Sequence, residues 1–501
     1  MVRSDTLPAA QGEVVDLREL PEVVAVFGGR LERWRALGFA GLPTAHPPVP
    51  PDEARRRSEA DERTPTALAV AANGVHQGSH AGMQLYVSHR GVRQTEAAVG
   101  WATGDAAMTS RTLLPWFCGM KPLFVLGFAL LWEAGEVDLW QPVSDVVAEL
   151  AGGGKERLTF WHLLTHTSGL SPDPMYAALW GSKEEVLAAI WEAALPEGSY
   201  PGAQAYYAQF WAWAVLAEAI ERRSGMPHAR FLQREILDPL GVDDCALEVT
   251  DEVWARDGHR MGPIYDTESD DAPQLLPAGA PRGQFPMYAP GSVGVGSAGA
   301  LGRIAEALLP HPPRPLLQPQ TTAALCARHR VGMWDEHWGA FLSWGLGLVA
   351  DGWIFGSLCS PLTVGHVGYN TSFFCVDPAH ELVVAGIANG LCSAHTSAER
   401  DRGVTDGVYR DLGLATPAPP APRIVAVDPP VGLGLATARA RAEARFWDPA
   451  SADSPIDPEG PDDPADPGDD PINATSPTRP TNPTNPTSTA AEPAANPEGT
   501  P

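Results

Sequence analysis

The first regular pattern of apolar and polar residues lies between residues 75 and 101. Residues 84–88 place apolar and aromatic side chains between polar ends, and a second apolar run closes at residues 98–100. A turn that contains a glycine, residues 89–91, separates the two runs. Short β-prone runs on both sides of such a turn are typical of a β-hairpin. We therefore predict that a sheet begins here.

The apolar spacing then becomes helical from residue 122 to residue 244, and glycines and prolines divide this segment into separate helices. A glycine-rich loop, residues 291–302, and an amphipathic helix that ends at Leu309 follow. Further strand patterns come after this helix. The order of all these patterns predicts that the late strands pair with the early hairpin around a helical middle, in a layered α+β fold. The late strand patterns lie at residues 345–350, 363–367, 372–376 and 382–387.

The two ends of the chain differ in composition from its middle. Residues 1–62 carry one helical stretch and then a cluster of prolines, so we interpret them as an N-terminal extension. Residues 416–501 are rich in Pro, Asp, Thr, Asn and Ala and lack apolar periodicity, which predicts a disordered tail. A short helix at residues 436–446 stays open as an alternative. The remaining domain, residues 63–415, comprises a sheet part (63–113 and 290–415) and a helical part (114–289).

Composition narrows the function classes. A net charge of −26 argues against nucleic acid or an anionic membrane as partner, because both require a basic surface. The longest apolar run, residues 122–132, is well short of the ~20 residues that cross a bilayer. The first residues lack the apolar core of a signal peptide, and the six cysteines form no C-x-x-C pair. We therefore expect a cytoplasmic protein with free thiols, no membrane span, no metal and no cofactor.

The tetrapeptide Cys118-Gly-Met-Lys121 places a nucleophile and a base three positions apart. Residues with this spacing lie on one face of a helix, so the thiol and the amine can share a proton. Lysine is rare here: the chain has three, Lys121, Lys155 and Lys183, among 35 basic residues. A buried lysine can lose its proton, whereas arginine cannot. The pattern favours covalent catalysis, with a buried helix start and a snorkelling lysine as the alternative for this motif alone.

The surrounding sequence resembles the S-x-x-K helix of the serine β-lactamase and penicillin-binding-protein superfamily, especially its class C-like esterases and transacylases. Residues 117–143 follow the superfamily pattern in which S-x-x-K-P leads into a helix that ends near G-x-L-x-L-x-x-P-V. Cys118 stands where these proteins have serine. Three more segments match in order: residues 158–170 (L-L-x-H-x-S-G-L), 201–209 (P-G-x-x-x-x-Y-S-N) and 365–370 (the H-x-G strand).

This resemblance covers roughly residues 65–413 and implies a β-lactamase-like fold, in which helices flank an antiparallel sheet and a helical subdomain is added. It also implies catalytic roles for four residues and places substrate or oxyanion contacts at four more. His166 and Ser168 are expected to fix backbone turns, and the loop 292–302 shows no phosphate-binding pattern. The implied catalytic residues are Cys118, Lys121, Tyr207 and His366, and the implied contacts are Gly368, Tyr369, Gln209 and Asn370.

Two of these assignments leave alternatives open. Tyr207 is in register with the superfamily's tyrosine, but the helix behind it is shifted by one residue, so Tyr206 remains a rival. Gln209 replaces the superfamily's asparagine. A tyrosine in such an aromatic run is by itself most often a core residue. The order and the spacing of the four motifs together favour the catalytic interpretation.

The implied mechanism is acyl transfer through a thioester on Cys118. Backbone N–H groups of Cys118 and Tyr369 would hold the oxyanion of an ester, thioester or amide substrate, small-molecule or peptide. Because a thioester reacts with amines more readily, relative to water, than an oxyester does, the cysteine favours a transacylase over a strict β-lactamase. An inactive binding protein of the same fold is the main alternative. A papain-like enzyme is disfavoured because the C-G-x-C-[WY] context is absent and Lys121 would be unexplained.

Overall fold

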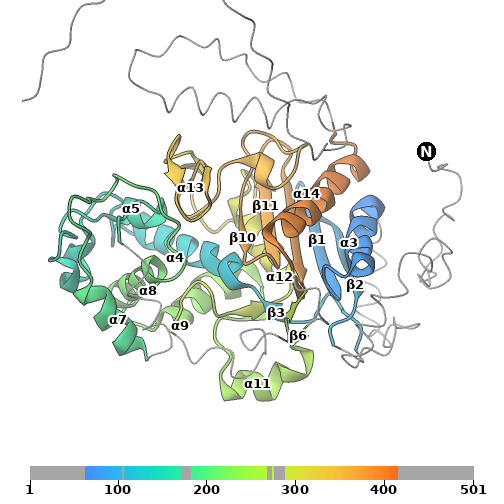
Figure 1. Cartoon of the computed structure of the whole chain (residues 1–501), viewed down its shortest axis with the longest axis horizontal. Coiled ribbons are helices and arrows are strands. Elements are labelled where there is room, and N and C mark those ends of the chain that lie inside the picture. Colours follow the sequence, from blue (N-terminus) through green and yellow to red (C-terminus); the bar gives the residue numbers. More distant parts are fainter. Residues whose placement is uncertain (1–62, 104–105, 171–181, 268–273, 276–287, 416–501) are drawn as a thin grey trace, which may run out of the picture. The chain divides into compact units, whose positions relative to one another are not determined.

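The computed structural model describes residues 63–415 apart from 104–105, 171–181, 268–273 and 276–287 (Figure 1). The expected N-terminal extension, the tail and its helix at 436–446 lie outside the described residues. The proposed domain boundaries therefore stay predictions. Within the described segments, no helix is both long and apolar enough to cross a membrane. The expected cytoplasmic location also stays a prediction.

A five-stranded antiparallel sheet joins the early hairpin to the late strands, in the order β10-β11-β12-β1-β2. The hairpin strand β1 pairs with β12, and Met83 lies opposite Ala388 in that register. This pairing confirms the predicted α+β fold with non-sequential sheet assembly. The strands are β1 (Gly82–His89), β2 (Val92–Gly100), β10 (Val364–Gly368), β11 (Ser372–Asp377) and β12 (Leu382–Ala388).

The turn of the predicted hairpin has a tight two-residue form. Arg90 and Gly91 connect β1 to β2 with φ values of 53° and 70°. Positive φ at both central positions matches the right-handed twist of the flanking strands, and a glycine adopts it without steric cost. The hairpin prediction is confirmed, because its local signals required no information from the rest of the fold.

Helices cover both faces of this sheet (Figure 1). In β1, Leu85 and Val87 belong to the core formed with α3 (Pro65–Gln77) and α14 (Ala394–Asp411). Tyr86 points to the opposite face, where α12 (Ala298–Ala305) packs. Successive side chains of a strand alternate between faces, so one strand serves both cores. At Gly302 of α12, a Cβ would lie 2.1 Å from the Tyr86 ring, which explains the glycine in this helix.

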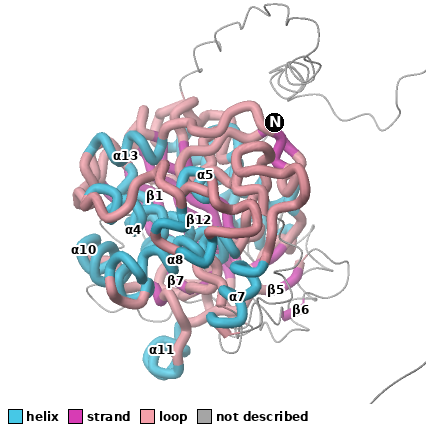
Figure 2. Tube along the Cα trace, turned by 90° about the vertical axis from the view of Figure 1, so that its left-hand side faces the viewer, coloured by secondary structure: helices cyan, strands magenta, loops and turns pink. Residues whose placement is uncertain are grey.

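The middle of the chain is helical, as predicted. Its first long helix, α4 (Lys121–Glu133), is buried over most of its length and packs against α8 (Trp211–Ser224). Figure 2, turned by 90° from Figure 1, shows the same grouping of helices beside the sheet. The other α-helices described in this part are α5 (Phe160–Leu164), α7 (Lys183–Glu192), α9 (His228–Leu232), α10 (Asp238–Leu240) and α11 (Asp251–Asp257).

The predicted strand at residues 345–350 is wrong. This segment forms single bridges, between Trp344 and Val349 and between Val349 and Gly365. Gly347 has a φ of 69°, and a Cβ there would lie 2.3 Å from a methyl group of Val125. The apolar run therefore folds into a tight turn against α4. The remaining late strands form within one or two residues of their predicted positions.

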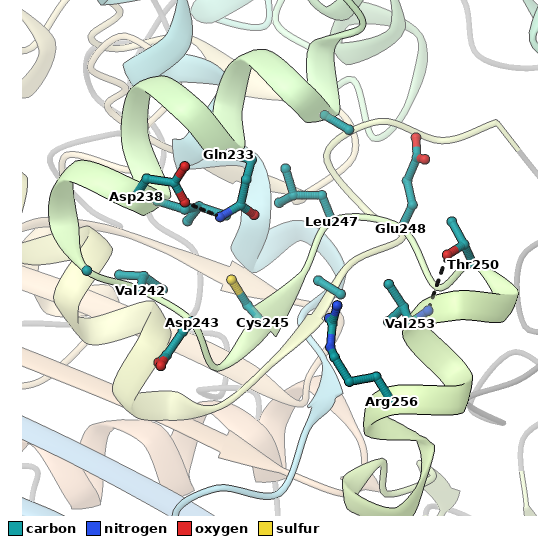
Figure 3. Close-up of a pocket in the computed structure, with 14 residues that line it drawn as sticks. Gln233, Asp238, Val242, Asp243, Cys245, Leu247, Glu248, Thr250, Val253 and Arg256 are labelled. Atoms are coloured by element: carbon teal, nitrogen blue, oxygen red, sulfur yellow. Dashed lines mark hydrogen bonds between the residues drawn. The ribbon is translucent and has the colours of Figure 1, made fainter.

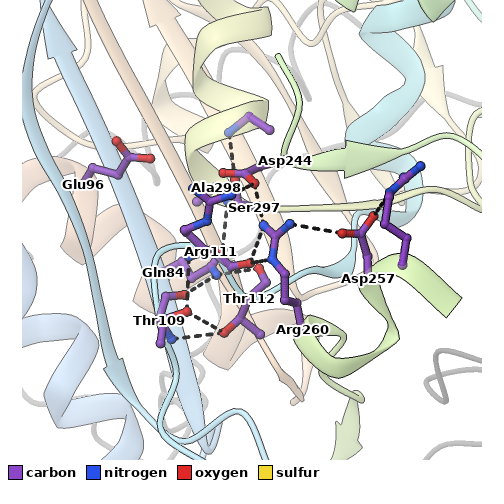
Figure 4. Close-up of polar contacts among 12 residues, drawn as sticks. Gln84, Glu96, Thr109, Arg111, Thr112, Asp244, Asp257, Arg260, Ser297 and Ala298 are labelled. Carbon is purple, nitrogen blue, oxygen red and sulfur yellow. Dashed lines mark hydrogen bonds and ion pairs between the residues drawn. The ribbon is translucent and has the colours of Figure 1, made fainter. Parts of the chain in front are cut away.

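Polar side chains join the sheet to the segments beside it (Figure 4). The Gln84 amide of β1 donates to the carbonyl oxygens of Thr109 (2.6 Å) and Thr112 (2.7 Å), and its oxygen accepts the Ala298 N–H at the start of α12 (2.8 Å). Nearby, the Asp244 carboxylate accepts hydrogen bonds from two arginines, Arg111 and Arg260. These contacts hold the chain that leads into Cys118 against both β1 and α12.

Candidate functional site

Cys118 lies in a short 3-10 helix, η2 (Phe117–Met120), directly before α4. We expected it in the first turn of the α-helix itself, and the structure begins α4 three residues later, at Lys121. Pro122 explains this start, because proline fits the first helical turn, where its missing N–H has no intrahelical partner. In a 3-10 turn residues three apart eclipse each other, so Cys118 and Lys121 remain neighbours.

The side chain of Lys121 is fully buried. Its Nζ donates to the carbonyl oxygen of Gly291 and to Oγ of Ser292, both at 3.2 Å. It also lies 5.3 Å from the centre of the Trp213 ring. Burial lowers the pKa of Lys121 below its usual value, and the charge of Cys118 and a hydrogen bond with that residue oppose this shift in part. The amine is therefore easier to deprotonate than an exposed lysine.

The backbone before Cys118 is strained and firmly held. Phe117 has a φ of 46°, which is unfavourable for a residue with a Cβ. The carbonyl oxygen of Trp116 accepts the Gly119 N–H at 2.9 Å and the Ser372 hydroxyl at 2.7 Å. Surrounding contacts must enforce such a conformation. The Ser372 hydrogen bond is one of them, and it ties the turn that carries the thiol directly to β11.

The structure separates the two rival tyrosines. The centre of the buried Tyr207 ring lies 5.7 Å from Nζ of Lys121 and 5.9 Å from the His366 ring. Tyr206 is only half-buried, and its ring lies 5.8 Å from that of His337. Position thus favours Tyr207, whereas its chemical role stays a prediction.

His366 lies on β10 and is fully buried. Its Nδ1 bonds to the carbonyl oxygen of Val367 at 2.8 Å, which requires a proton on Nδ1 and leaves Nε2 as an acceptor. Burial lowers the pKa of His366 to about 3, and the charge of Lys121 acts in the same direction. The imidazole is therefore neutral near pH 7. Nε2 is buried without a hydrogen-bond partner among the described residues.

The end of β10 packs against the cysteine turn. A Cβ at Gly368 would lie 2.3 Å from the carbonyl oxygen of Trp116 and 2.9 Å from the Gly119 nitrogen, so only glycine permits this contact. Tyr369 follows with a φ of 42°, and its exposed ring makes an edge contact with Phe117 at 5.5 Å. Asn370 has a φ of 58°, and its side-chain amide donates to the carbonyl oxygen of Cys392 at 3.2 Å.

Sequence reasoning missed the loop that covers Tyr207. The buried Asp335 carboxylate accepts the Tyr207 N–H at 3.2 Å and the His337 N–H at 3.1 Å, and it pairs with the buried Arg330 guanidinium at 2.9 Å. Nε2 of the His337 ring lies 3.0 Å from the side-chain amide nitrogen of Gln209. Gln209 is thereby placed at the edge of the site. No local pattern indicated Asp335, because its partner Tyr207 is 128 residues away.

Sequence reasoning gave no catalytic role to two other parts of the site. His166 has a φ of 57° and accepts the Ala208 N–H at Nδ1, which confirms that it fixes a turn. Its ring also packs on Tyr207 at 4.6 Å and thereby supports the candidate tyrosine. The glycine-rich loop, in which we found no phosphate-binding pattern, supplies two hydrogen-bond acceptors to Lys121, the Gly291 carbonyl oxygen and the Ser292 hydroxyl.

A separate hollow of about 680 Å³ lies beside η6 (Gln233–Leu237) and α11 (Figure 3). It is lined by Cys245 among others, and burial raises the pKa of that thiol to about 12. None of the eight predicted site residues lines this hollow. Across the part of the chain that the structure describes, no three His, Cys, Asp or Glu side chains converge in a manner that would hold a metal ion.

The comparisons with known proteins identify a family and relatives of similar sequence. A family model described as Beta-lactamase matches residues 68–408. Esterase EstB from Burkholderia gladioli is 28% identical over 311 residues, which make up 56% of this chain and 78% of that protein.

Two solved structures illustrate the likeness in fold. EstCE1, described as a hydrolase with promiscuous acyltransferase activity, matches with a TM-score of 0.60 at 19% identity, over 69% of this chain and 98% of that one. Unliganded simvastatin synthase (LovD) from Aspergillus terreus matches with a TM-score of 0.58 at 16% identity, over 70% of this chain and 98% of that one. At these identities the structures establish the β-lactamase-like fold that the sequence predicted.

Proposed function

The chain belongs to the Beta-lactamase family, and on that basis we propose that it is an acyl-transfer enzyme, a transacylase or an esterase-type hydrolase, with Cys118 as nucleophile. The observation that carries this proposal is the half-buried Cys118 one turn before a buried lysine whose pKa is lowered. A thiol beside an amine that can accept its proton is the arrangement that covalent catalysis requires.

In the first half-reaction, Lys121 accepts the Cys118 proton and the thiolate attacks the carbonyl carbon of the substrate. A C–S bond forms and the carbonyl oxygen becomes an oxyanion. By resemblance to the family, the backbone N–H groups of Cys118 and Tyr369 hold this oxyanion. A single donor of this kind contributes about 3–4 kcal/mol to transition-state stabilisation in acyl-transfer enzymes. The tetrahedral intermediate then expels the leaving group.

Tyr207 is the proton carrier of the second step in this proposal. Its place beside Lys121 supports transfer of the proton from the amine to the departing alcohol, thiol or amine. In the second half-reaction water, an amine or a thiol attacks the thioester, its proton returns through Tyr207, and the Cys118 thiol is regenerated. A neutral His366 beside the Tyr207 ring fits this path, because it adds no charge that would oppose proton movement.

Three residues shape the substrate contacts in this proposal. Gly368 lets the end of β10 pack on the Trp116 carbonyl oxygen, beside the turn that carries Cys118. Gln209, held by His337, offers an amide at the edge of the site, and Asn370 stabilises the turn beside it. The aromatic walls around Tyr207 favour an apolar acyl group on a small molecule or a peptide.

The relatives support acyl transfer or hydrolysis as the reaction class. One is named an esterase, and one solved structure is described as a hydrolase that also transfers acyl groups. The alternative of an inactive binding protein is disfavoured, because Lys121, Tyr207 and His366 are all present and lie together.

The decisive experiment measures the mass of the intact protein after exposure to a panel of activated esters and thioesters. We expect an added acyl mass on wild type, mapped to the peptide that contains Cys118, and none on the Cys118→Ala variant. Acylation of both proteins alike would contradict a Cys118 nucleophile. A wild type that stays unmodified with every donor, while it binds them reversibly, would support the inactive binding protein.

A further inference from the structure

A buried arginine on α14 reaches the turn that follows β10. The side chain of Arg400 is 3% exposed, and its Nη2 donates to the carbonyl oxygen of Asn370 at 3.0 Å. Its Nη1 lies 3.9 Å from Sγ of Cys392, and its Nε donates to the Asp401 carboxylate at 2.8 Å. Each nitrogen of the guanidinium group thus has a partner, and one of these partners is the backbone of the candidate site.

The turn itself is conformationally costly. Tyr369 and Asn370 both have positive φ values, 42° and 58°, a region that residues with a Cβ seldom occupy unless the surrounding structure enforces it. Two contacts close the turn on one side, since the Thr371 N–H and hydroxyl both donate to the carbonyl oxygen of Gly368, at 3.0 and 2.9 Å. On the other side, the Asn370 side chain is bonded to the carbonyl oxygen of Cys392. Arg400 adds the contact that links this turn to α14.

The charge arrangement also favours a backbone target for Arg400. Asp401 is buried beside it and balances its charge, so the guanidinium group needs no further anion. Its remaining N–H groups are directed at the Asn370 carbonyl and the Cys392 thiol. Because the side chain is almost wholly buried, it is placed to act on the turn and not on a bound substrate.

We propose that Arg400 is a positioning residue that fixes the Tyr369–Asn370 turn and thereby aims the Tyr369 N–H at the oxyanion. The catalytic part of this inference rests on the proposed function. The anchoring part does not, because it concerns the conformation of the turn in the free protein. The two parts are therefore tested by separate measurements on the full-length chain.

The test variant is Arg400→Met combined with Asp401→Asn, which removes both buried charges and leaves neither unpaired. Arg402→Met is the matched control, since Arg402 lies on the same helix but bonds to the Ile354 carbonyl oxygen and stacks on Trp353. Hydrogen exchange reports on the anchor. We expect the amides of the 369–371 turn to exchange at least about tenfold faster in the double variant, and at the wild-type rate in the control.

Kinetics report on the catalytic part. For a reactive ester we expect the rate of Cys118 acylation to fall about 10–100-fold in the double variant, less than the 10²–10³ loss from removing an oxyanion donor altogether. Affinity for a peptidyl trifluoromethyl ketone that forms a tetrahedral adduct should fall by the same factor. Affinity for the corresponding unreactive amide should stay within about twofold, because only the oxyanion contact changes.

The outcomes separate the two claims. A folded double variant whose turn exchanges at the wild-type rate overturns the anchoring role of Arg400. A loosened turn with unchanged acylation, or an equal loss for both ligands, overturns its catalytic role. If wild type is never acylated while the double variant still loosens the turn, the proposed function fails and the anchor stands.

Discussion

Nζ of Lys121 lies 5.7 Å from the centre of the Tyr207 ring, although the two residues are 86 positions apart and belong to different elements. Both side chains are buried, Trp213 packs against Lys121, and His166 packs against Tyr207. In the proposed mechanism, a proton that leaves the thiol through Lys121 enters a buried group of side chains that also contains Tyr207. This relationship makes the chemistry testable by single substitutions.

Replacement of the buried tyrosine should separate the two rival assignments. We expect Tyr207→Phe to reduce turnover of an activated ester by about 10²–10⁴-fold, the usual contribution of a positioned acid or base. Tyr206→Phe, which removes the same hydroxyl one residue earlier, should retain turnover within about threefold, because Tyr206 is only half-buried whereas the buried Tyr207 ring lies beside Lys121. Steady-state kinetics of both variants decide the matter. The reverse ranking would assign the role to Tyr206.

Replacement of Lys121 by arginine should be nearly as damaging as replacement by alanine. Arginine keeps the charge but cannot accept the Cys118 proton. We expect both variants to lose at least about 10²-fold in acylation rate, measured by stopped-flow with a chromogenic thioester. Lys183→Arg is the matched control, since Lys183 makes ion pairs with Glu218 and Glu221 outside the site. Near-normal acylation by Lys121→Arg would mean that the lysine supplies charge alone.

Cys118 should be the most reactive of the six thiols. Burial raises the pKa values of Cys245 and Cys326 to about 12, and a hydrogen bond with Cys359, together with burial, raises that of Cys375 well above the usual range. We expect iodoacetamide to modify Cys118 at least about tenfold faster than any other cysteine at pH 7, as peptide mapping would show. Lys121→Ala should reduce this advantage. Faster modification of Cys392 or Cys359 would contradict an activated nucleophile.

Several features were accessible from the sequence because their causes are local. The hairpin depends on a two-residue turn whose conformation Gly91 permits, and the order of the motifs places Cys118 before Tyr207 and His366. Such signals need only a few neighbouring residues, so their predictions hold in the structure.

Other features depend on contacts between distant segments, and the sequence alone did not reveal them. Lys121 bonds to Gly291 and Ser292 across 170 and 171 residues, and Asp335 holds the backbone of Tyr207 across 128. The apolar run at 345–350 was assigned to a strand because periodicity does not report that Gly347 takes a positive φ against α4. Tertiary packing, not local propensity, determines these positions.

Acid should destabilise the fold through its buried histidines. His80 bonds to Ser79 and to the carbonyl oxygen of Ala71, and burial, with the charge of Arg400, lowers its pKa to about 3. Between pH 6.5 and 3 the unfolded chain binds a proton at this position that the folded state does not, so stability is lost as pH falls. The expected slope is about 1.4 kcal/mol per pH unit for each such histidine.

Urea unfolding between pH 7 and pH 4 measures this effect. His80→Gln removes about one of the protons that are taken up on unfolding. The slope of the unfolding free energy against pH should therefore fall by about 1.4 kcal/mol per pH unit, whatever the effect on absolute stability. His395→Gln is the control, because His395 is largely exposed and gains no such burial. Equal slopes for wild type and His80→Gln would show that His80 titrates alike in both states.

The choice between transfer and hydrolysis should depend on the sulfur of Cys118. A thioester intermediate reacts with an amine in preference to water more strongly than an oxyester does, so wild type should partition toward the transfer product as acceptor concentration rises. Cys118→Ser forms an oxyester in the same site and should shift the product ratio toward hydrolysis. The measurement is the ratio of transferred to hydrolysed product from one ester donor across a series of amine concentrations, for both proteins. If wild type hydrolyses the donor at every amine concentration and Cys118→Ser gives the same ratio, the cysteine does not select transfer, and the enzyme is a thiol esterase of this fold.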